Sequence, residues 1–281
     1  IDPPPWRRRS CPDEPCVVLD LPDRSVLQKP PGWRVDADEE DAGQKWSQLP
    51  QCLSSAFPPR LWPIARDAEH QRGLLHRLDV PSSGVVLVAK TYAAFWDLQL
   101  QLVTGGMIRD YAVLCHGWLP PARLELRGRV HWHRRAGSAS TVLQRGRPSK
   151  SLTKTLAHSL DGMGVAFSLL AIRIATGRRH QIRVHVAHVG YPTVGDSKYA
   201  AQTTAANDFA SCPRNFLHRY RLAFADGAGS TQEAVVPLPP DLVLTFEGMS
   251  FRSRASQEAL RQWTAGSAPR RWEDLRTLGP P

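Results

Sequence analysis

The chain has 281 residues, of which 42% are hydrophobic and 22% are charged. This ordinary globular composition excludes a wholly disordered or collagen-like chain. No apolar run approaches the roughly 18 residues of a membrane helix. The formal net charge of +10 favours a polyanionic partner, most often nucleic acid and less often an anionic membrane surface.

The first half of the chain is expected to contain short extended elements. Residues 1–16 are rich in proline and charge and predict a flexible leader, with no apolar core of a secretory signal. Two short strands around a turn are predicted within 17–26, then a rigid turn at 29–33. Loop with a short helix is expected over 34–70, and GVVLVA at 84–89 predicts a buried strand.

A capped helix follows this buried strand. Thr91 is placed to cap it, and Gly105 to end it. Its apolar residues at helical spacing are Tyr92, Phe95, Trp96 and Val103. Further strands are predicted over 108–118 and 169–174, and a helix over 180–189.

The five cysteines stand at positions 11, 16, 52, 115 and 212. Their odd number and the lack of C-x-x-C spacing predict free thiols. Free thiols are typical of a reducing compartment inside the cell, whether cytoplasm, nucleus or organelle.

Positive charge is concentrated in one stretch of the sequence. Residues 122–154 hold nine Lys or Arg against the single acid Glu125, and 171–190 add four Arg and no acid. A lone charge run usually means a solvated surface, but here two segments nearly lack acids and Trp132 lies between two histidines. This pattern favours binding to the phosphate backbone of RNA or DNA, without reading its bases.

Two compact clusters contain the candidate chemical groups, one at 75–84 (LHRLDVPSSG) and one at 176–185 (TGRRHQIRVH). By residue type alone, Asp79 can be an ordinary loop carboxylate bonded to nearby amides. A serine hydrolase using Ser83 is disfavoured because no G-x-S-x-G elbow surrounds it. A metal site on the histidines of 180–188 is disfavoured because no carboxylate or cysteine completes the set.

Together these clusters resemble the RluA-type pseudouridine synthase family. The family pattern H-R-L-D-x-x-T-S-G is similar to residues 76–84, with Ser82 in place of threonine. The pattern G-R-T-H-Q-I-R-V-H is similar to 177–185, with Arg179 in place of threonine. Weaker matches are K-P-x-G at 29–32, the basic-x-Tyr strand at 109–111, L-H at 217–218 and P-L-P at 237–239. Arg219 replaces a commonly small residue.

The resemblance implies the isomerisation of uridine in structured ribosomal or transfer RNA to pseudouridine, without cofactor or metal. The target base must be flipped out, and the implied catalytic residues are Asp79 as nucleophile, Arg183 as its ion-pair partner and Tyr111 stacked on the base. RNA contacts are expected from His76, Arg77, Arg109, Arg134, Arg135, Lys150, Arg178, Arg179 and His180. An inactive RNA-binding or RNA-folding protein on the same scaffold is the alternative.

The implied fold is α+β, with a bent, mostly antiparallel mixed sheet, flanking helices and loops, and an active-site cleft across the sheet. We assign 17–248 to the catalytic domain and 249–281 to a basic C-terminal tail with short helices near 256–263 and 270–278. The expected partner is RNA, with no membrane and no metal, and the expected state is a monomer.

Overall fold

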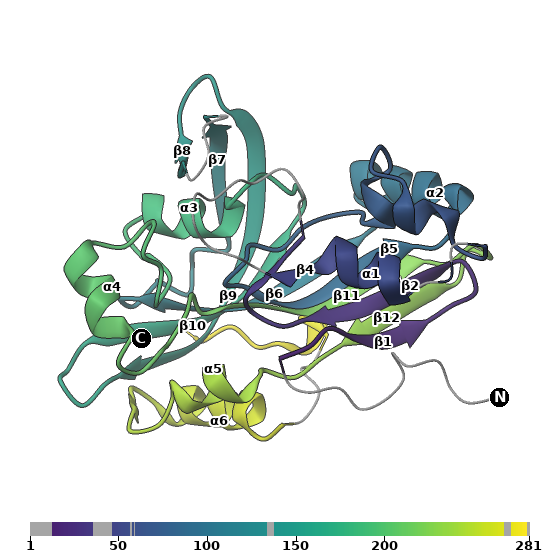
Figure 1. Cartoon of the computed structure of the whole chain (residues 1–281). Helices are drawn as coiled ribbons and strands as arrows, with labels where there is room; N and C mark the ends of the chain where they lie inside the picture. The colour runs from purple at the N-terminus through teal and green to yellow at the C-terminus, as the bar shows by residue number, and fades with distance from the viewer. Residues whose placement is uncertain are drawn as a thin grey trace. The chain divides into compact units, whose positions relative to one another are not determined.

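The structure is a computed structural model that describes residues 13–35, 47–56, 58, 60–133, 138–266 and 271–279. The chain divides into two compact units. The first comprises Ile1–Ile108 and Arg221–Ala234, and the second Arg109–Tyr220 and Val235–Pro281. Mostly antiparallel strands with few flanking helices confirm the predicted α+β class (Figure 1).

The first unit is built on a buried central strand. β1 (Cys16–Asp20) and β2 (Arg24–Lys29) form the antiparallel pair predicted around residue 22, and β5 (Ser83–Ala89) pairs antiparallel with β2. β5 is buried along its whole length, as expected from its run of β-branched residues. Beside β5 comes β11 (Leu217–Ala225), which belongs to this unit from Arg221 onward and pairs with β12 (Thr231–Val235).

Short elements complete this unit between β2 and β5. They are the parallel pair β3 (Trp33–Arg34) and β4 (Ser47–Gln48), helix α1 (Leu49–Ala56) and two 3₁₀ turns at Pro63–Arg66 and Gln71–Gly73. The expected loop with a short helix is therefore confirmed in its described part.

Helix α2 (Tyr92–Thr104) begins and ends where the sequence predicts. The Thr91 hydroxyl accepts a hydrogen bond from the Ala94 amide at 3.1 Å, and Gly105 ends the helix in the left-handed conformation. Of the four apolar residues at helical spacing, Phe95 is buried, together with Ala94 and Leu98, whereas Trp96 is 61% and Val103 82% exposed.

The second unit contains an antiparallel sheet in the order β6-β10-β9-β7-β8. Its strands are β6 (Ile108–His116), β10 (Ala166–Ile174), β9 (Arg147–Leu160), β7 (Glu125–Trp132) and β8 (Ser140–Val142), and β13 (Ser250–Phe251) pairs with β9. The predicted strands at 108–118 and 169–174 correspond to β6 and β10. The long strand β9 was not predicted.

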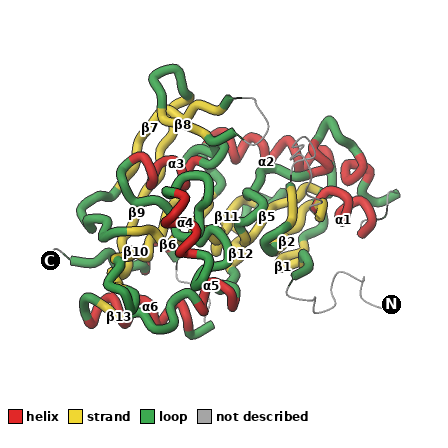
Figure 2. The backbone as a smooth tube through the Cα atoms, turned by 60° about the vertical axis from the view of Figure 1, so that its left-hand side comes forward, coloured by secondary structure: helices red, strands yellow, loops and turns green. Residues whose placement is uncertain are grey.

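Helices cover both faces of this second sheet (Figures 1 and 2). α3 (Gln181–His188) packs on β7 and β8, and α6 (Arg254–Thr264) packs on β9 from the other side. Two shorter helices are α4 (Gln202–Asp208) and α5 (Pro240–Leu244). The core cluster unites Leu260 and Trp263 of α6 with Ala112 and Leu114 of β6.

Side-chain alternation along the strands then places the candidate residues of this unit. Successive strand residues point to opposite faces of a sheet. Because Ala112 and Leu114 join the core on the α6 side, Tyr111 faces the α3 side. On β11, Tyr220 belongs to the same core, so Arg219 faces the α3 side as well.

The C-terminal segment packs against strand β9. The Lys154 ammonium donates to the carbonyls of Trp272 and Leu275 at 2.6 and 2.7 Å, and the Leu278 amide donates to Thr155 at 2.8 Å. The predicted helix near 256–263 is confirmed as α6. In the described part of 270–278, the expected short helix is a single 3₁₀ helix at Trp272–Asp274.

Candidate active site

Asp79 lies in a loop that leads into the buried strand β5. Hydrogen bonds from the K-P-x-G turn hold this loop in place. The Lys29 ammonium is fully buried and donates to the carbonyls of Pro30, Trp33 and Val80. The Gly32 amide also donates to Val80, at 2.9 Å. Asp79 itself is half-buried, and its carbonyl accepts from the Ser82 amide at 3.0 Å. A remote lysine therefore fixes the backbone that carries the candidate nucleophile.

Tyr111 is held through its hydroxyl by the buried Arg219 guanidinium. Arg219 Nε and Nη2 donate to the Tyr111 oxygen at 2.8 and 2.5 Å, and the guanidinium carbon lies 5.0 Å from the ring centroid. Both side chains are at least 97% buried. The sequence marks Arg219 only as a departure from the family pattern, and nothing local in the sequence indicates this contact.

Arg183 of α3 forms a buried, two-pronged ion pair with Asp196. Nε and Nη2 of Arg183 each donate to a carboxylate oxygen at 2.7 Å. Burial alone would raise the pKa of Asp196, but hydrogen bonds and the charge of Arg183 hold that pKa below its ordinary value. The pairing of Arg183 with Asp79 stays a prediction. The structure adds Asp196 to the candidate site, a residue that the motifs did not indicate as a site residue.

The turn that precedes α3 is fixed by side-chain hydrogen bonds. His180 adopts left-handed backbone angles (φ +54°), rare for a residue other than glycine. Its Nδ1 lies 2.9 Å from the Tyr199 hydroxyl, which accepts from the Ser140 amide at 2.7 Å. Gln181 accepts from the Thr176 hydroxyl and the Arg178 amide. These bonds orient the helix that carries Arg183.

His185 attaches α3 to β9 in its neutral form. Its Nε2 and Nδ1 lie 2.8 and 3.1 Å from the hydroxyls of Ser149 and Ser151. Burial, with a smaller effect of the nearby His188, lowers the pKa of His185 to about 4. The imidazole of His185 therefore serves as a packing and hydrogen-bonding group.

Acidification is expected to weaken the fold through His185. Because the pKa of His185 is about 4 in the folded protein and 6.5 for an unperturbed histidine, the unfolded chain takes up the proton first, and stability falls between pH 6.5 and 4. The fall is about 3 kcal/mol for this group. Urea unfolding across this range measures it, and His185→Gln should flatten the pH dependence. An unchanged slope in that variant would contradict the assignment.

The basic stretch folds into β7, β8 and β9. Arg127 and Arg129 of β7 and Arg147 of β9 are exposed. Lys150 pairs with Glu125 at 2.8 Å, and Arg179 lies over the Trp132 ring at 4.6 Å. Arg134 and Arg135 lie outside the described residues. By the register of β7 and β9, Arg147 lies on the face that packs against α3, whereas Arg127 and Arg129 project from the opposite face.

Arg109 occupies a different environment from these exposed arginines. It is 3% exposed, and its Nη2 donates to the Ala175 carbonyl at 3.1 Å. Burial, with a smaller contribution from Arg219, lowers the pKa of Arg109. Of the other predicted RNA contacts, His76, Arg77 and Arg178 are half-buried.

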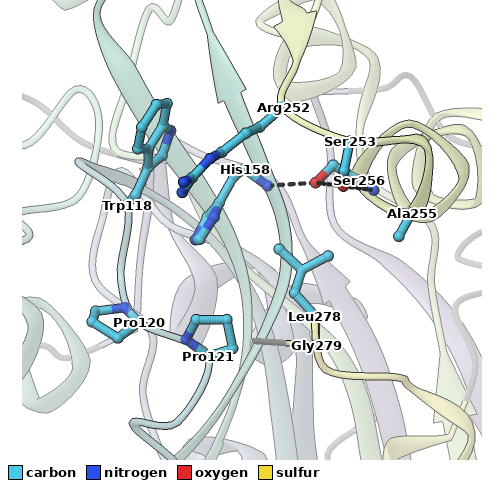
Figure 3. Close-up of a pocket in the computed structure, with 10 residues that line it drawn as sticks. All are labelled: Trp118, Pro120, Pro121, His158, Arg252, Ser253, Ala255, Ser256, Leu278 and Gly279. Carbon is cyan, nitrogen blue, oxygen red and sulfur yellow. Dashed lines mark hydrogen bonds between the residues drawn. The ribbon is translucent and has the colours of Figure 1, made fainter. Parts of the chain in front are cut away.

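A separate pocket of about 610 Å³ lies in the second unit, near the start of α6 (Figure 3). Its lining includes Trp118, His158 and Arg252 and none of the predicted catalytic residues.

In the described ranges, no helix is long and apolar enough to cross a membrane. Nor do those ranges contain a cluster of three His, Cys, Asp or Glu side chains arranged for a metal ion. Of the five cysteines, the four described are free thiols, as predicted.

Known proteins resemble this chain over most of its length. A family model of RNA pseudouridylate synthases matches residues 25–188, and the chain belongs to this family, as an RluA-type member. An uncharacterized RNA pseudouridine synthase of Chloroflexus aurantiacus is 32% identical over 72% of this chain and 61% of its own length. Ribosomal large subunit pseudouridine synthase D of Haemophilus influenzae is 30% identical over 81% of this chain and 68% of its own.

A solved structure supports the fold. Human RNA pseudouridylate synthase domain containing 1 has a TM-score of 0.67 at 21% identity, covering 94% of this chain and all of that chain. The chain spans 55–61% of the length of the first four curated relatives.

Proposed function

We propose that the protein is an RNA pseudouridine synthase that isomerises uridines in structured RNA. In this reaction the C1′–N1 glycosidic bond breaks, the base turns, and C1′ joins C5, which then loses its proton. Product and substrate are isomers, so the reaction needs no redox partner. The observation that carries the proposal is the joint presence of Asp79, Tyr111 and Arg183 within family motifs of a chain that belongs to this family.

Each of the three residues has a chemical role in this proposal. Asp79, as a carboxylate, attacks the flipped-out nucleotide. Arg183 keeps positive charge near the reacting groups, which favours ionised carboxylates in a site that excludes water. Tyr111 offers a flat ring for stacking and an oxygen for the proton at C5.

Release of tritium from RNA carrying [5-³H]uridine tests this function directly, because rejoining at C5 expels that hydrogen. We propose ribosomal RNA as the first substrate to test, supported by the name of the Haemophilus influenzae relative, with bulk transfer RNA in parallel. Release from either RNA would establish the reaction and its substrate class. Tight binding without release from both RNAs would favour the alternative of an inactive RNA-binding protein.

We further propose that the arginines of β7 and β9 bind the phosphate backbone. Changing Arg127, Arg129 and Arg147 together to Gln should weaken RNA binding about 10-fold or more at 0.15 M salt. The salt slope of log K should drop by about 2 to 3 units, because each phosphate contact contributes about 0.9. Fluorescence anisotropy with labelled RNA across a salt series measures both.

A matched control carries the same charge change elsewhere in the second unit. Arg254 and Arg261 of α6 and Arg276 of the C-terminal segment are also exposed, and their triple Gln variant should keep the wild-type salt slope. Equal losses in both variants would mean that net charge, and not the position of the arginines on β7 and β9, controls binding.

A further inference from the structure

The Tyr111 hydroxyl has an unusual partner for a residue on a sheet face. Arg219 directs two N–H groups at one phenol oxygen, at 2.8 and 2.5 Å. Both side chains are buried, so water does not compete with either hydrogen bond. A guanidinium that is 2% exposed carries a large desolvation cost, and the sequence marks Arg219 as a departure from a commonly small residue.

Only one assignment of donor and acceptor is possible at this contact. Arginine offers donors and no acceptor. The Tyr111 oxygen must therefore accept from Arg219, and its own O–H must point to a different acceptor. The contact thus fixes both the position of the phenol oxygen and the direction of its proton.

Arg109 cannot take over this role. It lies two residues before Tyr111 on β6 and therefore on the same face of the strand. Its Nη2, however, donates to the Ala175 carbonyl at 3.1 Å, and no hydrogen bond from it to the Tyr111 oxygen is found among the described residues. Arg219 is the guanidinium that orients the phenol.

We propose that Arg219 is a positioning residue that acts on the reaction through the Tyr111 hydroxyl, an inference that rests on the proposed function. In the last step the phenolic proton first leaves for its acceptor, so that the Tyr111 oxygen carries negative charge. The C5–H bond then breaks and its electron pair forms the C5–C6 double bond, while the pair of the C6–N1 double bond moves to N1, which takes a proton from water. The C5 proton passes to the Tyr111 oxygen. Charge-assisted bonds from Arg219 hold the oxygen in place and stabilise negative charge that develops on it.

The activity test is a double-mutant cycle. Arg219→Met should lower kcat about 10- to 100-fold and change KM for RNA by less than about 3-fold. In the Tyr111→Phe background, the same change should cost less than about 2-fold, because the hydroxyl through which Arg219 acts is gone. Arg219→Lys, which keeps charge and one donor, should recover part of the rate. Equal losses in both backgrounds would overturn the proposal.

An isotope effect separates positioning from a structural role. If Arg219 assists proton removal, Arg219→Met should raise the kcat isotope effect measured with [5-²H]uridine RNA. General loss of folded enzyme would leave it unchanged. Arg221→Met is the matched control, because Arg221 is a buried arginine on the same strand that pairs with Glu233 at 3.0 Å. It should leave this isotope effect at the wild-type value.

A spectroscopic measurement remains decisive if the wild type releases no tritium, an outcome that would refute the proposed function alone. With ¹³Cζ-labelled tyrosine, the Tyr111 resonance is assigned from its loss in Tyr111→Phe. Arg219→Met should shift that resonance and leave the other four tyrosines nearly unmoved. An unmoved Tyr111 resonance in a folded variant would show that Arg219 does not hold the hydroxyl.

Discussion

Asp79→Asn is expected to reduce tritium release from [5-³H]uridine RNA on the order of 10³-fold or more. Asparagine keeps the size of aspartate but removes the negative charge that makes the side chain a nucleophile. The loop should keep its conformation, because its bonds to Lys29 and Gly32 are made by the backbone of Val80. RNA affinity should stay unchanged or rise slightly, since the variant loses one negative charge that repels the RNA phosphates.

A matched control tests the simpler interpretation of Asp79 as an ordinary loop carboxylate. Asp226 is such a carboxylate, which accepts from the Ala228 and Ser230 amides at 2.9 Å in a turn of the first unit. Asp226→Asn should retain wild-type tritium release. If Asp79→Asn retained it as well, the proposed mechanism would be wrong.

Asp196→Asn is expected to lower the free energy of unfolding by about 3 kcal/mol, because it removes one partner of a buried ion pair. It should also reduce kcat, since the Arg183 guanidinium loses the carboxylate that orients it through two bonds of 2.7 Å. Urea unfolding at pH 7 and tritium release measure the two effects. The pKa of Asp196 is held low, so its stabilisation persists above its unfolded pKa and fades only as the pH falls through the lower folded value.

Asp110→Asn separates the two effects of Asp196→Asn. Asp110 is also fully buried and forms a two-pronged pair, with Arg173, at 2.7 and 2.9 Å. The two asparagine variants should lose similar stability, but Asp110→Asn should lose far less activity. Equal activity losses would indicate that general destabilisation, and not the orientation of Arg183, explains the Asp196 result.

Sequence patterns predicted the elements whose burial follows a simple period or a cap. β5 is an unbroken β-branched run, and α2 is bounded by Thr91 and Gly105, so both were anticipated. β9 was missed because its Ser and Thr residues are buried between basic side chains, a burial that depends on α3 and α6 on the two faces. Its basic residues were visible as a charge run, but their strand arrangement was not.

Motifs predicted the candidate catalytic residues but not what holds them. Asp196 follows Arg183 by thirteen positions, and Arg219 follows Tyr111 by 108. No local pattern connects residues at such separations, because the contacts exist only once α3, β6 and β11 are folded. Arg219 was visible only as a substitution of unexplained purpose.

The hydrogen bonds that hold the Asp79 loop in place determine where the chain tolerates added length. Lys29 and Gly32 both bond to Val80, so the chain segment between these contacts has its two ends already joined. Lengthening a joined loop costs only about 0.6 kcal/mol per doubling. An epitope or fluorophore tag inserted in the turn beside Leu61, which is 66% exposed, would therefore add entropy to this segment without displacing the carboxylate, which makes this turn a site for reporters that leave the chemistry intact.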